Sequence, residues 1–219
     1  MRFKIKSPQD RTMAKLPIEI VRIGNNVEKE IDEVIELLNN TQKEIQFSVL
    51  SVSDEEKFQI LNFNEVDVDE QLEKIEKIRD ELKGYHPFMI AITNSHLVCD
   101  EYDNLFGSCI SEKGLAIFTF YNVPDVIIPT DKIKAYITYY LARYTFNFLI
   151  PDHKNHSDTR NCVFDFKQLK TDILKSMKNA ALCDECRSKI TNPRYSMSAR
   201  QFTSLDSIFG IAGNLLVTD

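Results

Sequence analysis

The sequence lacks a long apolar run. No segment has the roughly 18 to 20 uninterrupted apolar residues needed to span a bilayer. The first residues, Met1 to Lys6, carry positive charge, but no apolar stretch follows that could form the core of a signal peptide. Internal repeats and low-complexity segments are also missing. We therefore expect a soluble, cytoplasmic protein that makes no contact with a membrane.

An excess of positive charge is missing as well. The chain has 27 Lys and Arg against 33 Asp and Glu, a formal net charge of -6 and a pI near 5.3. Its basic residues are scattered among acidic ones, whereas proteins that bind nucleic acids concentrate them in a patch. The most basic segment, residues 167–178, has the spacing of the solvated face of an amphipathic helix. The sequence therefore predicts no nucleic-acid partner.

Cysteines are few, and they do not suggest a set of disulfides. In a reducing compartment we interpret Cys99 and Cys109 as unpaired thiols. The pair Cys183 and Cys186 has Cys-x-x-Cys spacing, which can place two thiolates on one metal ion, and Cys162 precedes it. These three residues are candidate metal ligands. The alternative for Cys162 is a buried free cysteine, which is common in protein cores.

A nearby histidine would complete the four-coordinate shell that structural zinc prefers. Both His153 and His156 stand shortly before Cys162. A closed shell of four protein ligands leaves no position open for water or substrate. The sequence therefore predicts one structural zinc ion per chain, which by itself does not assign an activity.

Apolar residues along the chain alternate between strand-like and helical spacing. The nearly unbroken apolar run at 87–93 is typical of a strand that is covered on both faces, as in a parallel sheet between helices. The sequence predicts an α/β fold with a mixed, mostly parallel sheet, flanking helices and a C-terminal helix. The expected strands are 18–23, 44–52, 87–93 and 115–123; the expected helices are about 27–38, 72–82, 130–149 (with Thr130 as N-cap), 166–178 and 202–215; and the acidic stretch 54–70 is expected as a loop.

Two parts of the chain resemble the archaemetzincins, a family of zinc metallopeptidases. Residues 104–109, Asn-Leu-Phe-Gly-Ser-Cys, and then 113–119 are similar to the strand region that precedes the family's active-site helix. The pair His156-Ser157, then Cys162, then Cys183 and Cys186 follow the order of the family's third histidine and its cysteines. The resemblance covers roughly residues 87 to 190 and implies a metzincin-like fold.

The catalytic motif of that family is missing. Where archaemetzincins have His-Glu-x-x-His, the best-fitting segment is Tyr139-Tyr140-Leu141-Ala142-Arg143. A zinc peptidase needs two imidazoles one helical turn apart and a carboxylate that activates the metal-bound water. The resemblance therefore implies a metzincin-like fold with an inactive catalytic centre. We predict no catalytic residues and expect the aromatic rings to fill the former cleft.

The resemblance also bears on the predicted zinc ligands. Archaemetzincins bind a second zinc through four cysteines, and Ser157 stands where one of them would be. Because a hydroxyl is a poor zinc ligand beside an imidazole, a histidine should complete a Cys3His shell. We favour the set His156, Cys162, Cys183 and Cys186, with His153 as the alternative to His156.

Two functions remain at this point. We favour a catalytically inactive pseudopeptidase, a zinc-binding protein that binds another protein or a peptide of unknown identity. The alternative is a zinc-dependent peptidase or other hydrolase with a relocated metal site around His153 and His156, which an open site with three protein ligands would distinguish. Residues 1–190 are expected to form the archaemetzincin-like domain. Residues 191–219, after the break at Thr191-Asn192-Pro193, are expected to form a helical extension packed on it.

Overall fold

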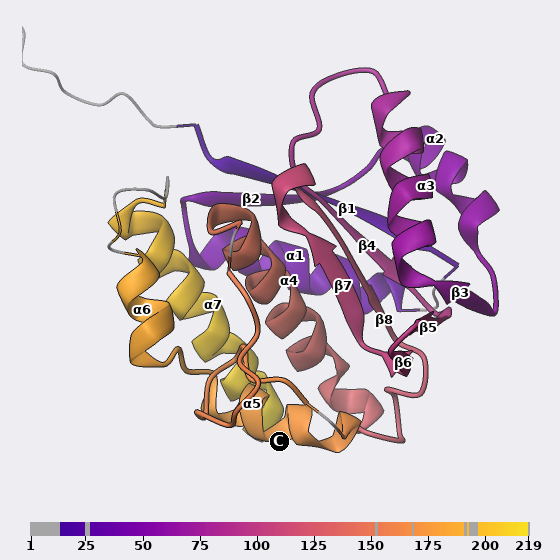
Figure 1. The fold of residues 1–219 in the computed structure, drawn as a ribbon. Helices are drawn as coiled ribbons and strands as arrows, with labels where there is room; N and C mark the ends of the chain where they lie inside the picture. The colour runs from indigo at the N-terminus through magenta and orange to yellow at the C-terminus, as the bar shows by residue number, and fades with distance from the viewer. Residues whose placement is uncertain are drawn as a thin grey trace, which may run out of the picture.

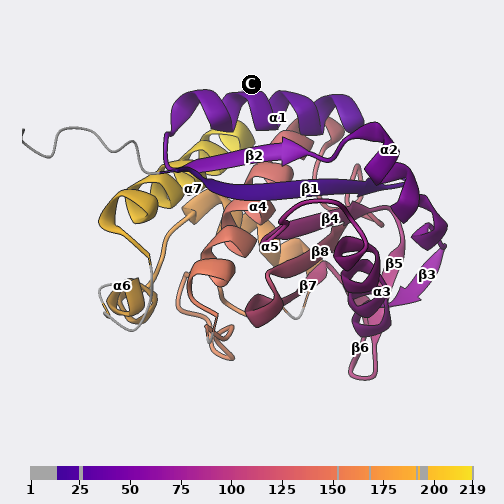
Figure 2. The same cartoon turned by 90° about the horizontal axis from the view of Figure 1, so that it is seen from above.

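The computed structural model describes residues 14–24, 27–151, 153–167, 169–190, 192 and 197–218. A five-stranded sheet with the order β2-β1-β4-β8-β7 forms its centre (Figures 1 and 2). Neighbouring strands are parallel except for β7, which runs antiparallel to β8 at one edge. The predicted α/β fold with a mixed, mostly parallel sheet is thus confirmed. The strands are β1 (Leu16–Ile23), β2 (Ile45–Val49), β4 (Met89–Thr93), β7 (Gly107–Ile110) and β8 (Leu115–Thr119).

Helices cover both faces of this sheet, and Figure 1 shows α3 on one side and α4 on the other. Alternate residues of a strand point to opposite faces. In β1, Ile18 and Ile20 accordingly pack in one apolar cluster, and Val21 and Ile23 pack in a second one. All five residues of β4 are buried, which explains its unbroken apolar sequence. The first cluster lies under α1 (Glu28–Thr41) and α4 (Ile133–Leu149), and the second lies under α3 (Val68–Asp80).

The expectation of a loop over residues 54–70 is wrong. Three of its apolar side chains, Phe58, Leu61 and Val66, are buried against the second face of the sheet and order the segment. Asp67 then caps α3, since its side chain accepts hydrogen bonds from the amides of the next turn. The segment forms α2 (Val52–Glu55), the 3-10 helix η1 (Glu56–Leu61), β3 (Glu65–Asp67) and the start of α3.

Short strands near the edge strand were also missed. A second, three-stranded sheet has the order β3-β5-β6, with β5 (His96–Cys99) and β6 (Tyr102–Leu105). Each of these strands has three or four residues, which is too few to show a clear alternation. The strand expected over 115–123 ends at Thr119, and Asn122 follows with a positive φ of 53°. This second sheet lies beside the carboxyl ends of β4 and β8.

The central helix is α4, and it is buried along nearly its whole length. Thr130 does not cap it but begins a short 3-10 helix, η3 (Thr130–Lys132), which leads into α4 at Ile133.

The helix expected over 166–178 is shorter in the structure. It consists of the 3-10 helix η4 (Lys170–Asp172) and α5 (Ile173–Asn179), and α6 (Asp184–Ile190) follows.

The C-terminal helix α7 (Ala199–Val217) lies along α4 and α5 (Figure 1). It starts with a capping box formed by Ser198 and Gln201. Leu205, Ile208 and Phe209 are fully buried in the first apolar cluster, so α7 completes the core. Most of the break expected at residues 191–193 lies outside the described residues, and the division at residue 190 stays a prediction. No helix in the described ranges is long and apolar enough to cross a membrane.

Candidate metal centre and cleft

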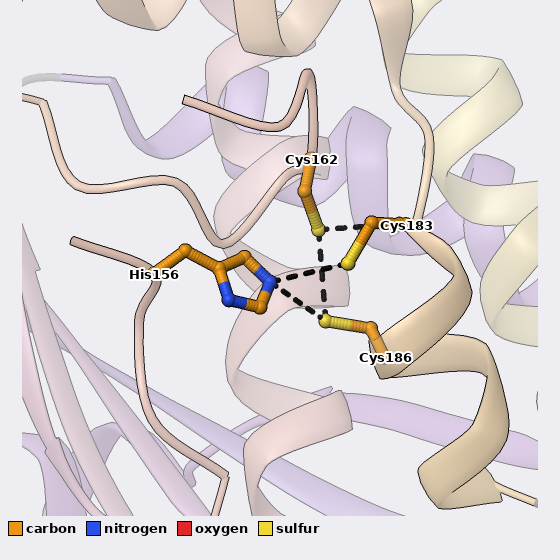
Figure 3. Close-up of side chains that lie close together, drawn as sticks. All are labelled: His156, Cys162, Cys183 and Cys186. Atoms are coloured by element: carbon orange, nitrogen blue, oxygen red, sulfur yellow. Dashed lines mark hydrogen bonds between the residues drawn. The ribbon is translucent and has the colours of Figure 1, made fainter. Parts of the chain in front are cut away.

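The side chains predicted as metal ligands lie together between α4 and α6. The ligand atoms of His156, Cys162, Cys183 and Cys186 all lie within 4.8 Å of one another (Figure 3). His156, Cys162 and Cys186 are buried, and Cys183 is half-buried. Segments that are distant in the sequence thus form a group that could bind one metal ion.

The donor atoms suit zinc, and their spacing is within a few tenths of an ångström of that in a zinc site. The sulfurs of Cys162 and Cys186 are 3.6 Å apart, and Nε2 of His156 lies 3.1 Å from Cys186 Sγ and 3.3 Å from Cys183 Sγ. In a tetrahedral site with Zn–S bonds of about 2.3 Å and Zn–N bonds of about 2.0 Å, ligand atoms are roughly 3.5 to 3.8 Å apart. Three sulfurs and one imidazole form a typical structural set, with no position left for water. The group could therefore hold one zinc ion.

His153 lies next to this group but outside it. Its Nε2 is 3.8 Å from Cys186 Sγ, and its Nδ1 is 3.3 Å from Nζ of Lys189. Burial, together with the nearby Lys189 charge, lowers the pKa of His153 to about 3, so the ring is neutral at physiological pH. The distances favour His156 over His153 as the fourth ligand.

Local structure explains how the loop after α4 presents its ligands. The backbone of His156 pairs with Phe164 and Phe166 through two hydrogen bonds, of 2.9 and 2.8 Å. Asp165 Oδ2 accepts hydrogen bonds from the amides of Arg160 (2.8 Å) and Cys162 (3.0 Å). The loop is therefore folded back on itself, with its two ligands on the same side.

The second half of the site is a turn that leads into α6. Cys183 directly precedes α6, and Cys186 lies in its first turn. The amide of Cys183 also donates a hydrogen bond to Cys162 Sγ, at 3.4 Å. The Cys-x-x-Cys spacing places both sulfurs on the same side of this helix start, as the sequence predicts.

The thiols are electrostatically coupled. The pKa of Cys162 is lowered, because its sulfur accepts a hydrogen bond from the Cys186 thiol, which keeps its proton. Three thiolates so close together would repel one another in the absence of a cation. A bound zinc ion would supply the positive charge that keeps all three deprotonated.

A cleft of about 740 Å³ opens beside the metal group. It lies between the edge strand β7, the buried helix α4 and the loop that carries His156 and Cys162. Tyr102 and Phe166 face each other at its rim with ring centroids 5.3 Å apart. The walls of the cleft thus include α4, the helix that carries the segment found in place of the catalytic motif.

Within α4, side chains of the segment Tyr139 to Arg143 form hydrogen bonds with the metal-binding loop. The Tyr139 hydroxyl donates a hydrogen bond of 2.7 Å to the carbonyl of Val163. Nη1 of Arg143 donates to the same carbonyl, and its Nη2 donates to Asn155 Oδ1 at 2.6 Å. Val163 directly follows Cys162 in the sequence. The metal group and the wall of the cleft are therefore one connected structure.

The aromatic residues of α4 belong to the core, as expected. Tyr139 and Tyr140 are almost completely buried, and burial raises the pKa of Tyr139, Tyr140 and Tyr144, so these hydroxyls are neutral. They do not fill the cleft, however.

The close approach of β7 to α4 requires glycine at position 107. A Cβ on Gly107 would lie 2.4 Å from the Tyr144 hydroxyl and 2.1 Å from the carbonyl oxygen of Ile117.

The interpretation of residues 167–178 as a solvated basic face is only partly right. Lys175 and Lys178 are exposed, but Lys167 and Lys170 line the cleft. Burial lowers the pKa of Lys167 to about 7 and that of Lys170 to about 8. Sequence spacing could not separate the two pairs, because η4 and α5 are shorter than the helix it predicted.

Two further cleft residues were not singled out from the sequence. Arg143 was considered only as a replacement for a catalytic histidine, and Asn147 lies one helical turn further along α4. Both are 9% exposed and line the cleft. A charged and an amide side chain in an otherwise apolar buried helix were the available signal, because such groups are rarely buried without a partner.

Comparisons of sequence found no match, either to a protein-family model or to a curated protein. Solved structures do match. A zinc-dependent peptidase from Methanocorpusculum labreanum is 13% identical, with a TM-score of 0.56 over 78% of this chain and 98% of that chain. An archaemetzincin from Methanopyrus kandleri is 14% identical, with a TM-score of 0.52 over 81% of this chain and 97% of its own.

An archaemetzincin from Archaeoglobus fulgidus, in complex with malonate, gives a similar result. It is 16% identical and has a TM-score of 0.53 over 80% of this chain and 100% of that chain. Identities this low establish the fold and leave the activity open. The resemblance found in the sequence is thereby confirmed at the level of structure: the chain has the archaemetzincin fold, with a Cys3His group that could bind one zinc ion.

Proposed function

We propose that this chain is a catalytically inactive, peptidase-like module, which uses a structural zinc site to shape a cleft that binds a peptide or an extended protein segment. The cleft beside β7 carries this proposal, since it has an open strand edge but no His-Glu-x-x-His on its helix. One structural neighbour is a zinc-dependent peptidase by name, and one fold can carry several functions, including binding without catalysis.

The edge strand β7 supports binding of an extended peptide. In the described part of the chain, no strand pairs with it on the side opposite β8. The amide of Thr119 donates to the carbonyl of Phe106 at 2.9 Å, and backbone groups alternate along a strand. Those of Gly107 and Cys109 should therefore face away from β8, and both residues line the cleft. A peptide could add here as a further strand, held by main-chain hydrogen bonds.

The alternative is a hydrolase with a metal site around His153 and His156. One observation favours it: His153 is neutral and lines the cleft, so it could bind a metal there. However, its Nδ1 faces the Lys189 ammonium and its Nε2 faces Cys186, which is already part of the four-ligand group. An open three-ligand site would require the group to rearrange. We therefore place this function second.

A single experiment separates the two functions. The zinc-loaded chain is mixed with a pool of random peptides, and both binding and cleavage are followed, the latter by mass spectrometry. We expect binding without cleavage, and slower hydrogen exchange at the amides of Gly107 and Cys109 in the presence of peptide. Cleavage that disappears with a chelator and with His153→Ala would establish the hydrolase instead. Absence of binding would refute the proposed module.

A further inference from the structure

The wall of the cleft contains a buried positive charge without a counter-ion. Arg143 is 9% exposed, and its guanidinium contacts only neutral groups: the Val163 carbonyl, the Asn155 amide and the Tyr139 hydroxyl. In the described part of the chain, no ion pair joins it to a carboxylate. The ring of Phe164 lies under it, with the guanidinium carbon 5.0 Å from the ring centroid. A buried charge of this kind is unfavourable until an anion approaches it.

Most of the other charged side chains in the cleft are also basic. Lys154, Lys167 and Lys170 also line it, whereas its described carboxylates are those of Asp103 and Asp165. Asp165 directs Oδ2 to backbone amides of the metal-binding loop, and Lys167 donates to its backbone carbonyl rather than to its carboxylate. Lys170 lies over the Phe106 ring at 4.9 Å. A chain with a formal net charge of -6 thus has a locally positive cleft.

A buried hydrogen-bond acceptor beside Arg143 lacks a donor. Asn147 is 9% exposed, and its Oδ1 accepts no hydrogen bond. Residues four apart on a helix lie on the same face, so Arg143 and Asn147 face the cleft together. An arginine offers two parallel N–H donors that match a carboxylate, whereas the Asn147 oxygen needs an N–H donor. A peptide supplies both groups, since a carboxylate stands close to a backbone N–H.

We propose that the cleft recognises a carboxylate of its peptide ligand, with the carboxylate bound by Arg143 and supported by Lys167 and Lys170, and a neighbouring peptide N–H donating to Asn147. This inference rests on the proposed peptide-binding function and adds the chemical class of the ligand. Two sources of carboxylate fit the same site, the C-terminus of a chain and the side chain of Asp or Glu. Through this interaction the cationic cleft selects peptides that carry a carboxylate.

The test uses the zinc-loaded full-length chain and pools of short, N-acetylated, fluorescent random peptides. One pool has free C-terminal carboxylates, a second is C-terminally amidated and lacks Asp and Glu, and a third is amidated with one fixed Glu. We expect the first or the third pool to bind at least roughly 30-fold more tightly than the second, because a buried charge pair is lost in the second. Which of the two binds more tightly identifies the source of the carboxylate.

Substitutions in the cleft test whether Arg143 causes the preference for peptides with a carboxylate. Arg143→Gln should abolish the preference for the acid, and Arg143→Lys should retain only part of it, because a lysine cannot form the paired hydrogen bonds. The matched control is Lys175→Gln, since Lys175 is exposed outside this cleft and should leave binding unchanged. If Arg143→Gln fails to fold, as judged by circular dichroism, the double variant Lys167→Gln and Lys170→Gln serves instead and should weaken binding of the acid alone.

The outcomes separate the inference from the function on which it rests. Equal binding of all pools, with protection of the β7 amides, would refute carboxylate recognition but leave the peptide-binding module in place. No binding by any pool would refute both. A fourth pool, amidated and with one fixed phosphoserine, tests the other anion. Tighter binding of this pool than of the free-acid and Glu pools would replace the carboxylate with a phosphate and overturn the inference.

Discussion

Removal of zinc should destabilise the protein strongly, and Cys186 provides the sharpest way to test this. Cys186 is fully buried, and its sulfur lies 3.6 Å from Cys162 Sγ and 3.1 Å from His156 Nε2. Replacement by serine removes a thiolate from the centre of the group and leaves a hydroxyl, which is a poor zinc ligand. We therefore expect Cys186→Ser to lose the ion when the protein is purified.

The size of the effect follows from the coupling of binding to folding. An ion present at about 1,000 times its dissociation constant adds about 4.1 kcal/mol to the free energy of unfolding. For a chain of this length, each kcal/mol shifts the melting temperature by about 2 to 4 °C. Loss of zinc should therefore lower the melting temperature by about 8 to 16 °C. The sheet should stay folded at room temperature, because the second apolar cluster contains no residue of the metal group and most of the first cluster lies outside it.

The measurement combines metal analysis with thermal unfolding. Elemental analysis and X-ray absorption at the zinc edge should find one zinc ion per chain, bound by three sulfurs and one nitrogen. Unfolding is then followed with and without a chelator, for the original chain and for Cys186→Ser. Cys99→Ser is the matched control, since Cys99 is a half-buried cysteine outside the metal group. This substitution should change neither the zinc content nor the shift in melting temperature caused by the chelator.

Two results would refute this reasoning. If neither the chelator nor Cys186→Ser shifts the melting temperature, the group does not hold a stabilising ion. If the absorption spectrum shows mainly nitrogen and oxygen ligands with a bound water, the site is open, and the relocated hydrolase site becomes the better explanation. Acid should act in the same direction as the chelator, because protons compete with zinc for the thiolates and the imidazole.

Three further predictions concern the cleft and the core beside it. Tyr139→Phe removes the hydrogen bond to Val163 and should lower the free energy of unfolding, measured in urea, by about 1 kcal/mol. Gly107→Ala places a methyl group against the Ile117 carbonyl and should lower it by about 1 to 3 kcal/mol, whereas an unchanged value would mean that β7 shifts freely. Burial raises the pKa of the Cys109 thiol to about 11. At pH 8 this thiol should therefore react with iodoacetamide more slowly than a small-molecule thiol, and its rate should increase as the pH approaches 11. Comparable rates at pH 8 would contradict this burial.

Much of the main sheet could be predicted from the sequence. The strands β1, β2, β4 and β8 and the helices α1, α3, α4 and α7 were expected, because each has enough apolar residues at a regular spacing. The segment 54–70 was wrongly predicted as a loop, since Phe58 and Leu61 are ordered by contacts with residues that are distant in the sequence. The ion pair between Arg22 and Glu55, at 2.9 Å, is a further contact between distant parts of the sequence and joins β1 to α2.

The metal site, too, could be predicted only in part from the sequence. The three cysteines could be identified from their spacing, because a Cys-x-x-Cys pair places two sulfurs together whatever the surrounding fold is. Their histidine partner could not be chosen with certainty, since His153 and His156 are close in the sequence. In the structure, backbone pairing of His156 with Phe164 and Phe166 directs it toward the sulfurs, while His153 faces Lys189.

The sequence by itself determined the class of fold, the candidate ligands and the lack of a His-Glu-x-x-His motif, because periodicity, spacing and motif content are local properties of a chain. Only the tertiary structure decided which cations are buried. Arg143 of α4, Lys167 of the following loop and Lys170 at the start of η4 meet at the cleft, and their surroundings depend on contacts across the fold. The arrangement of these side chains in the fold, rather than the composition of the chain, gives this acidic protein a cationic cleft.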